Sequence, residues 1–205
     1  MTDELSTYLA PTEFIESEAP QVKALATSLK KSTTQETAIA LFYWVRDQIR
    51  YDVRTSADGR EMYRATAIIE RGSGYCVQKA VLLAALGRAA GIPTRLGFAD
   101  VRNHKIPERM LDFMGTDLFA FHGYVEFHLA GQWVKATPAF DQETSRRAGA
   151  LLVELDGTHD AMLHPVDPEG HPHIEYIRNR GSFADLPLEE LQQTFREVYG
   201  LRVES

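Results

Sequence analysis

A single cysteine stands at a point of the sequence where its thiol could become reactive. Cys76 is the only cysteine among 205 residues, and it follows Gly72, Ser73 and Gly74 directly before a long apolar run. If that run is a helix, the thiol lies in its first turn, where unpaired backbone N–H groups lower the pKa of a cysteine. The same N–H groups can bind the oxyanion that forms on an attacked carbonyl group. The position therefore supplies half of a cysteine nucleophile, and the other half must be a base.

Among the seven histidines, His122 is the best placed to be that base. It stands near the start of a segment in which apolar and polar residues alternate, as they do in a strand. Cysteine–histidine sites are assembled in space, so the distance between the two residues along the chain does not test the pairing. Two structural alternatives stay open. Cys76 can be an inert core residue, since cysteines are commonly buried, and His122 can merely make a hydrogen bond.

Helical patterns precede and follow these glycines. Apolar residues recur with helical spacing after Pro20, and Thr33 with Glu36 three residues later forms a capping box that predicts a second helix. Residues 76–90 are apolar at most positions, which predicts a helix that is buried on nearly all sides. A glycine and a proline directly after this run mark its end. The sequence thus predicts a central helix that begins at Cys76.

The segment that carries His122 is predicted to form a β-hairpin. Residues 121–129 alternate strictly, and an Ala-Gly pair then precedes a second short strand. A turn at that pair places Glu126 opposite Lys135, which is an opposite-charge pair across the two strands. It also places Thr137 on the same face as His122, where a group that orients the imidazole is expected.

The remaining patterns decide the fold class. Further strands are expected at 94–101 and 173–178 and a terminal helix at 186–199, whereas residues 102–119 are expected to be irregular. Helices come first and paired strands later, which favours an α+β domain over alternating βαβ units. We therefore predict a single α+β domain over residues 1–205, in which N-terminal helices and a central helix pack on an antiparallel sheet.

Composition narrows the classes of partner. The net charge is −7, from 22 basic and 29 acidic residues, which argues against a surface that binds nucleic acid through cationic contacts. The N-terminus lacks the positive start and apolar core of a signal peptide, and no run is apolar enough to span a bilayer. One cysteine cannot form an internal disulfide. We therefore expect a cytoplasmic protein whose partners include neither nucleic acid nor a membrane.

Three segments of the chain carry the motifs of a known family, in the same order. They are "ALFYWVRDQIRYD", "GSGYCVQKAVLLAALGRAAGIPTRLGFADV" and "FHGYVEFHLAGQWVKATPAFD". Together they resemble the catalytic core of the transglutaminase-like superfamily, a papain-related fold that includes transglutaminases, bacterial cysteine peptidases and peptide N-glycanases. The resemblance covers residues 36–141 and leaves 1–35 and 142–205 as extensions. It implies a papain-like fold with Cys76 as the nucleophile and His122 as the base.

The third member of the site is where the chain departs from the family pattern. Relatives commonly carry an aspartate four residues after the tryptophan of the partner strand, and Thr137 stands at that position here. A threonine can accept a hydrogen bond from an imidazole N–H but has no charge to stabilise an imidazolium. Asp141 is therefore expected to be the orienting acid, and Thr137 is the altered family position. Trp44, Tyr51 and Tyr75 are candidates for the substrate groove, although an aromatic core is the more common role.

The resemblance implies acyl transfer through a thioester, in which water or an amine finally takes the acyl group. Hydrolysis of a peptide or protein amide is favoured, because the chain lacks the extra domains of large animal transglutaminases, and no cofactor or metal is expected. One alternative is a catalytically inactive transglutaminase-like module that binds a peptide or a protein. Another is a zinc-dependent hydrolase that uses the aspartates and histidines of residues 156–173, although their spacing fits no tight motif.

Overall fold

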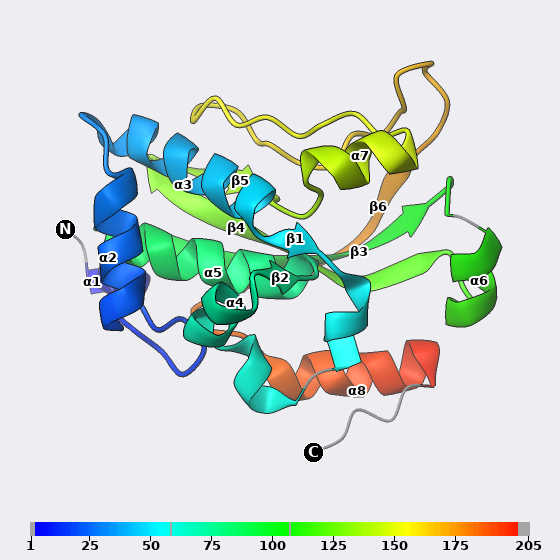
Figure 1. Cartoon of the computed structure of the whole chain (residues 1–205), viewed down its shortest axis with the longest axis horizontal. Coiled ribbons are helices and arrows are strands. Elements are labelled where there is room, and N and C mark those ends of the chain that lie inside the picture. Colours follow the sequence, from blue (N-terminus) through cyan, green and yellow to red (C-terminus); the bar gives the residue numbers. More distant parts are fainter. Residues whose placement is uncertain (1–2, 58, 107, 201–205) are drawn as a thin grey trace.

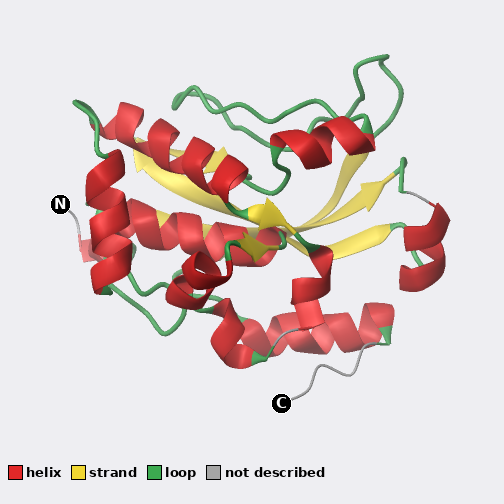
Figure 2. Ribbon diagram, viewed as in Figure 1, coloured by secondary structure: helices red, strands yellow, loops and turns green. Residues whose placement is uncertain are grey.

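One antiparallel sheet and a central helix organise the chain (Figures 1 and 2). The structure is a computed structural model and describes residues 3–57, 59–106 and 108–200. The helices are α1 (Asp3–Ser6), α2 (Pro20–Leu29), α3 (Thr34–Gln48), α4 (Ala65–Arg71), α5 (Cys76–Ala89), α6 (Glu108–Met114), α7 (Gln142–Ala148) and α8 (Leu188–Tyr199), with 3₁₀ turns η1 (Val53–Ala57) and η2 (Arg60–Tyr63). The strands are β1 (Arg50–Tyr51), β2 (Ser73–Gly74), β3 (Thr94–Asn103), β4 (Leu118–Leu129), β5 (Gln132–Ala136) and β6 (Ile174–Phe183). This mixture confirms the predicted α+β class.

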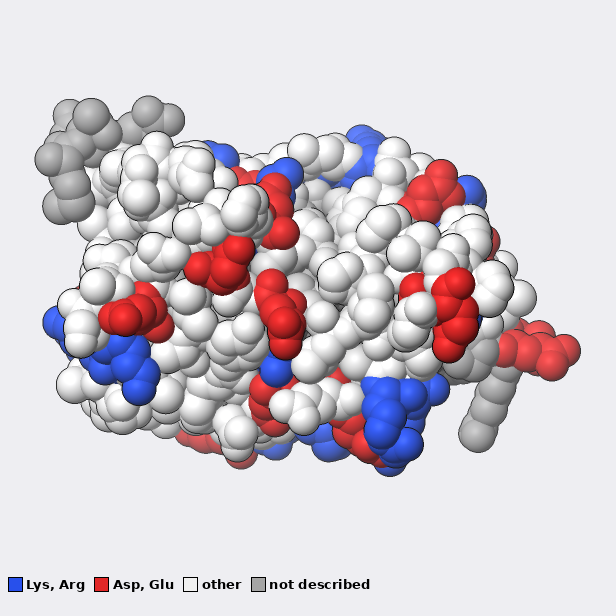
Figure 3. All heavy atoms as spheres, turned by 90° about the horizontal axis from the view of Figure 1, so that it is seen from above, with Lys and Arg blue, Asp and Glu red and all other residues white. Residues whose placement is uncertain are grey.

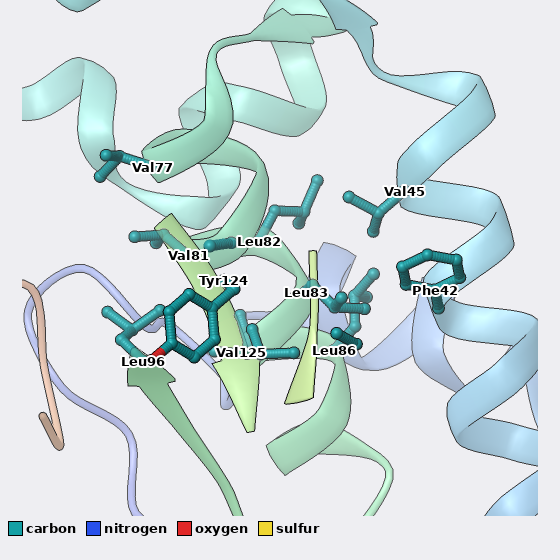
Figure 4. Packing of buried hydrophobic residues seen from close by; sticks show 14 of the residues in the cluster. Phe42, Val45, Val77, Val81, Leu82, Leu83, Leu86, Leu96, Tyr124 and Val125 are labelled. Carbon is teal, nitrogen blue, oxygen red and sulfur yellow. The ribbon is translucent and has the colours of Figure 1, made fainter. Parts of the chain in front are cut away.

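Helix α5 lies at the centre, as its apolar composition predicts. It packs against β3 and β4 on one side and against α2, α3 and α4 on the other (Figure 1). Figure 4 shows Leu83 and Leu86 of α5 lying toward Phe42 and Val45 of α3, with Val125 of β4 nearby. All five side chains are fully buried. Burial of a side chain of this size contributes about 1.5–3 kcal/mol, so the core holds the helix that begins at Cys76 firmly.

A buried lysine fixes α5 to the end of α3. The ammonium group of Lys79 donates hydrogen bonds to the carbonyl oxygens of Arg46 (2.9 Å) and Ile49 (2.6 Å). Arg46 lies in the last turn of α3 and Ile49 is its C-cap, where carbonyl oxygens lack partners within the helix. Burial lowers the pKa of Lys79 to about 7. At the other end of α3, Thr33 and Glu36 form the predicted capping box.

The four-stranded sheet has the order β5-β4-β3-β6, with antiparallel neighbours throughout. Glu126 stands opposite Lys135, so the predicted hairpin register is confirmed. Ala130 and Gly131 both have positive φ angles, 48° and 86°. A two-residue type I′ turn requires this geometry, because its twist matches that of the flanking strands. The turn therefore sets which residues of β5 lie opposite each residue of β4.

The prediction for residues 102–119 is wrong. Strand β3 continues to Asn103, α6 occupies Glu108–Met114, and β4 already begins at Leu118. Helix α7 was also not expected. Both helices have seven residues, too few to display a helical period in the sequence. The strand at 173–178 and the terminal helix are confirmed as parts of β6 and α8, and Gly200 ends α8 in the left-handed conformation.

Residues 150–173, here called the covering segment, run beside α3 and β5. Arg46 of α3 donates to the carbonyl oxygen of Val153 (2.7 Å), and Ala161 pairs with Ala136 at the end of β5. Figure 3 views the molecule from the side of α3 and this segment, where charged side chains of both signs are scattered among broad uncharged areas. None of the described helices has both the length and the apolarity that a bilayer-spanning helix needs.

Candidate active site

Cys76 is the first residue of α5, where the sequence places it. Gly72 ends α4 in the left-handed conformation (φ 65°), and β2 then pairs in parallel with β1 before the chain enters α5. The cysteine is half-buried and packs against the hydrophobic core. Its thiol therefore lies at the positive end of a 14-residue helix.

A buried glutamine, which the sequence analysis missed, locks the start of α5. The side-chain oxygen of Gln78 accepts hydrogen bonds from the hydroxyl of Thr55 (2.6 Å) and from the backbone N–H of Tyr75 (3.3 Å). Its amide nitrogen donates to the carbonyl oxygens of Thr55 (3.2 Å) and Met62 (3.3 Å). The nucleophile helix is thereby tied to both 3₁₀ turns. The sequence signal for this contact is a glutamine that stands two residues after the cysteine in a mostly apolar run.

Gly123 brings the histidine strand against the start of α5. A Cβ atom at this position would lie 2.8 Å from the Cα of Val77 and 3.2 Å from the carbonyl oxygen of Cys76. The two backbones therefore touch, and any side chain would separate them. His122 is the neighbouring residue, so this contact places the imidazole beside the helix that carries the thiol. A glycine inside a strand of bulky residues is the signal that could have predicted it.

Thr137 is the residue that contacts the imidazole. Its hydroxyl oxygen lies 3.0 Å from Nε2 of His122 and 3.5 Å from the carbonyl oxygen of Gly123. Both side chains are buried. With the threonine hydroxyl directed to that carbonyl oxygen, it can accept the Nε2 proton and leave Nδ1 free to act as a base. Thr137 thus occupies the orienting position that the family pattern assigns to an aspartate.

The carboxylate of Asp141 is engaged elsewhere. One oxygen accepts the N–H of Thr144 (2.7 Å) as the N-cap of α7, and the other accepts the N–H of Tyr51 (2.9 Å). These hydrogen bonds keep the pKa of Asp141 below its ordinary value, although burial opposes them. Asp141 therefore anchors the backbone of Tyr51, and the geometry favours Thr137 over Asp141 as the partner of His122.

Cys76 and His122 share one pocket. Its free volume of about 20 Å³ is enough for roughly one water molecule. The residues that line it come from β1, α5, β3, β4 and the C-terminal part of the chain: Tyr51, Cys76, Val101, Asn103, Phe119, His122, Phe140, Leu163 and Ile174. Leu163 and Ile174 also line a larger open groove of about 560 Å³ on the surface. These two side chains therefore form a wall between the groove and the sulfur.

The three aromatic candidates have different places. Tyr51 lines the pocket, and its ring meets that of Phe140 edge to face at 5.0 Å. Tyr75 is buried beside the nucleophile, and its hydroxyl lies 3.1 Å from that of Tyr63. Trp44 packs against the core outside the pocket lining. Of the three, the structure brings only Tyr51 to the pocket wall.

Burial controls the ionisation of the pair. It raises the pKa of the Cys76 thiol to about 11, although backbone N–H groups of Gly123, Val77 and Cys76 itself act in the opposite direction. It lowers the pKa of His122 to about 4. Burial therefore favours the neutral form of both groups at pH 7. The expected lowering of the thiol pKa by the helix N-terminus is not found here, because loss of water outweighs it.

Replacing Leu163 with alanine is expected to expose the thiol. Leu163 lines both the groove and the pocket, so it narrows the approach to the half-buried sulfur, and its burial contributes about 1.5–3 kcal/mol. Removing it is therefore expected to speed iodoacetamide labelling of Cys76 by about tenfold or more and to lower the free energy of unfolding by about 2 kcal/mol. Mass spectrometry measures the labelling rate. Leu151→Ala, in the same segment but exposed, is the control, and equal rates in both variants would refute a covering role for Leu163.

The Asp- and His-rich stretch folds into the covering segment. Asp167, Glu169 and His171 place one ligand atom each within 4.8 Å of one another. The Asp167 carboxylate is buried, and it accepts a hydrogen bond from the ammonium group of Lys105 (2.6 Å) and from two backbone N–H groups. His159 instead pairs with Asp156 at 2.7 Å on the surface. These contacts give the acids of the segment a structural role.

Comparison with solved structures supports the fold. The chain resembles a candidate cysteine protease from Cytophaga hutchinsonii, with 19% identity and a TM-score of 0.51 over 89% of this chain and 54% of that chain. Weaker similarity extends to a candidate protease from Parabacteroides distasonis (16% identity, TM-score 0.41, 64% of this chain, 25% of that chain). The periplasmic domain of TgpA from Pseudomonas aeruginosa is similar at the same level (24% identity, TM-score 0.42, 58% of this chain, 42% of that chain). The chain thus spans about half or less of the length of each.

Comparison with sequences identifies the family. Among curated proteins, no sequence matches the chain. The sequence model of the transglutaminase-like superfamily matches residues 23–138, which is more than half of the chain and includes Cys76, His122 and Thr137. Since this match covers more than half of the chain, including the helix that begins at Cys76 and the hairpin that carries His122, the chain belongs to the transglutaminase-like superfamily.

Proposed function

We propose that the protein is a cysteine-dependent hydrolase that cleaves amide or peptide bonds through a thioester. One observation carries the proposal: the only cysteine begins the central helix and shares a pocket with a histidine whose far nitrogen is held by Thr137. Membership of the superfamily supports cysteine-based hydrolase or acyltransferase chemistry at a coarse level. The choice of water as acceptor is part of the proposal.

The chemistry follows from the neutral pair. As the sulfur of Cys76 attacks the amide carbonyl carbon, Nδ1 of His122 takes the thiol proton. The backbone N–H of Cys76 helps to hold the oxyanion. The imidazolium then gives its proton to the leaving amine, and the carbon–nitrogen bond breaks to leave a thioester. Water, deprotonated by the same imidazole, attacks the thioester, and the thiol and a carboxylic acid are released.

Thr137 suits this form of the mechanism. A neutral imidazole needs a hydrogen-bond acceptor that fixes its tautomer, and the threonine oxygen supplies one. Without a carboxylate, the imidazolium that forms during attack is stabilised less than in a site with an aspartate. The proposed enzyme is therefore one whose imidazole is charged only while the reaction proceeds.

Hydrolysis is favoured over transfer to an amine by the size of the pocket. Its free volume suits one water molecule beside the sulfur. The neighbouring groove is lined mainly by apolar side chains, with His104 and Glu175 at its polar positions. A peptide that occupies this groove could reach the sulfur once Leu163 is displaced. We therefore propose an extended peptide amide as the substrate.

Trapping of the acyl group tests the proposal. A panel of fluorogenic peptide amides is incubated with the protein, with and without hydroxylamine, which converts a thioester to a hydroxamate. We expect amine release by the wild type, hydroxamate in the presence of hydroxylamine, and a loss of at least about 1,000-fold in Cys76→Ala. Activity that persists in Cys76→Ala and disappears with a chelator would instead support the zinc-dependent alternative.

The closed pocket also favours a second candidate, a catalytically inactive module that binds a peptide. A thiol with a pKa raised to about 11 in a pocket that holds one water molecule is the arrangement of a protected cysteine. This candidate predicts that peptides bind without amine release and without hydroxamate. The trapping experiment therefore separates the two candidates.

A further inference from the structure

The residue before His122 has a strained backbone. Phe121 has a φ angle of +56°, in the left-handed region, and its side chain is fully buried. A bulky residue adopts this conformation at a cost of about 1–3 kcal/mol, so the surrounding structure must impose it. The φ and ψ angles of Phe121 set the direction in which the next side chain leaves the strand. The conformation of Phe121 therefore controls the orientation of the proposed base.

A β-bulge accounts for this conformation. The register of β3 with β4 shifts between Ala99 and Val101, where the single residue Asp100 faces both Ala120 and Phe121. The register of β3 with β6 is irregular beside the same residue. Bulges bend a strand and redirect its side chains, and they recur next to active sites. An irregular point of the sheet thus lies directly before the histidine.

Side chains bind the two backbone N–H groups of the bulge. The N–H of Phe121 donates to the carboxylate of Asp100 (3.0 Å), and the N–H of Ala120 donates to the hydroxyl of Tyr199 (2.7 Å). The Tyr199 hydroxyl itself donates to the carbonyl oxygen of Leu118 (3.2 Å). A buried backbone N–H without a partner is costly. These hydrogen bonds therefore stabilise the bulge against a regular pairing of the strands.

Arg180 of β6 completes the arrangement. Its Nε donates to the same Asp100 oxygen at 2.6 Å, and its guanidinium carbon lies 4.4 Å above the ring of Phe121. The side chains of Arg180 and Asp100 are only 9% and 8% exposed. Helix α8 adds the Thr194 hydroxyl at 3.5 Å and the Glu190 carboxylate at 3.8 Å. Arg180 thus contacts both the carboxylate of Asp100 and the ring of Phe121.

We propose that Asp100, Arg180 and Tyr199 are positioning residues that aim His122 at Cys76 by holding the bulge in β4. The inference rests on the proposed function, because it assigns these residues to the orientation of the proposed base. Arg180 and Tyr199 lie outside the segment that matches the superfamily. The C-terminal part of the chain, through β6 and α8, therefore completes a site whose reacting groups all belong to the matched core.

The test compares labelling rates of Cys76 with iodoacetamide across pH in variants of the full chain. Arg180→Met is expected to slow labelling at pH 7 by about 100-fold, since a displacement of about 1 Å has that effect on a reacting pair. Tyr199→Phe, which removes one oxygen atom, is expected to slow it by about tenfold, as the loss of one hydrogen bond predicts. Arg180→Lys, which keeps the charge, is expected to recover part of the rate.

Arg95→Met is the matched control. Arg95 and Glu126 form a comparable ion pair between β3 and β4 (2.6 Å, 22% and 5% exposed), but away from the bulge. Thermal unfolding measures the stability of every variant. We expect Arg95→Met to lower the melting temperature as Arg180→Met does, while its labelling rate stays within about twofold of the wild type.

The outcomes separate this inference from the proposed function. If labelling of the wild type does not depend on His122, the proposed function is wrong. If it depends on His122 but remains unchanged in Tyr199→Phe and Arg180→Met, only the positioning role is wrong. If Arg180→Met does not fold, Tyr199→Phe decides alone, because it retains the ring and its packing.

Discussion

Replacing His122 with alanine is expected to change the pH dependence of Cys76 labelling from flat to steep. The pKa values of the pair are about 4 for His122 and about 11 for Cys76. From about pH 5 to pH 9 the thiol keeps its proton and the imidazole stays neutral. The labelling rate of the wild type is therefore expected to stay constant over this range. Without the imidazole only free ionisation of the thiol remains, and the rate rises about tenfold per pH unit.

At pH 7 the rate of Cys76 labelling is expected to be lower by about 100-fold or more in His122→Ala, because a general base usually contributes that much. Iodoacetamide labelling followed by mass spectrometry measures it, since the chain has a single cysteine. His128→Ala is the matched control, because His128 lies on the same strand and its ring contacts Trp133 at 5.1 Å instead of the pocket. A flat profile that survives in His122→Ala would show that His122 does not take the thiol proton.

Replacing Thr137 with aspartate is expected to activate the thiol. The threonine hydroxyl lies 3.0 Å from Nε2 of His122 in a buried environment. A carboxylate there would raise the pKa of His122 by about 1–3 units, because an adjacent opposite charge favours the imidazolium. An imidazolium beside the sulfur in turn favours the thiolate. Each unit corresponds to a factor of ten, so labelling at pH 7 is expected to increase by about tenfold or more.

Asparagine at the same position separates charge from hydrogen bonding. Thr137→Asn supplies an acceptor without a charge and is expected to label within about twofold of the wild type. Thr137→Val removes the acceptor and is expected to label up to about tenfold more slowly, which is the effect of one lost hydrogen bond. Denaturant unfolding shows whether each variant keeps its fold. Equal labelling rates for Thr137→Asp and Thr137→Asn would refute the idea that the absence of a negative charge at position 137 limits the reactivity of Cys76.

The C-terminal part of the chain contributes to the pocket through two sets of contacts. Leu163 of the covering segment lines it and closes it toward the surface groove. Arg180 and Tyr199 contact the bulge on the other side of His122. The first contact limits the pocket to a free volume of about 20 Å³, and the second stabilises the bulge directly before His122. Truncation before β6 removes Arg180 and Tyr199 but keeps Leu163, so we expect it to affect reactivity through the second contact.

The elements with long local patterns were predictable from the sequence. The capping box at Thr33, the central helix from Cys76 and the hairpin register at Glu126 all depend on residues a few positions apart. The short helices α6 and α7 were missed, because seven residues do not reveal a period. The bulge at Phe121 was missed because side chains that bind it, such as those of Asp100 and Tyr199, lie far from it along the chain.

The sequence by itself determined that a lone thiol begins a central helix and that a histidine occupies the strand of a hairpin. Only the tertiary structure decided that Thr137 holds the imidazole while Asp141 caps α7 and anchors Tyr51. It also decided that Leu163 lines the pocket and that burial favours the neutral forms of Cys76 and His122. The physical reason is that helices and turns arise from neighbouring residues. Hydrogen-bond partners and loss of water instead depend on which distant segments meet in space.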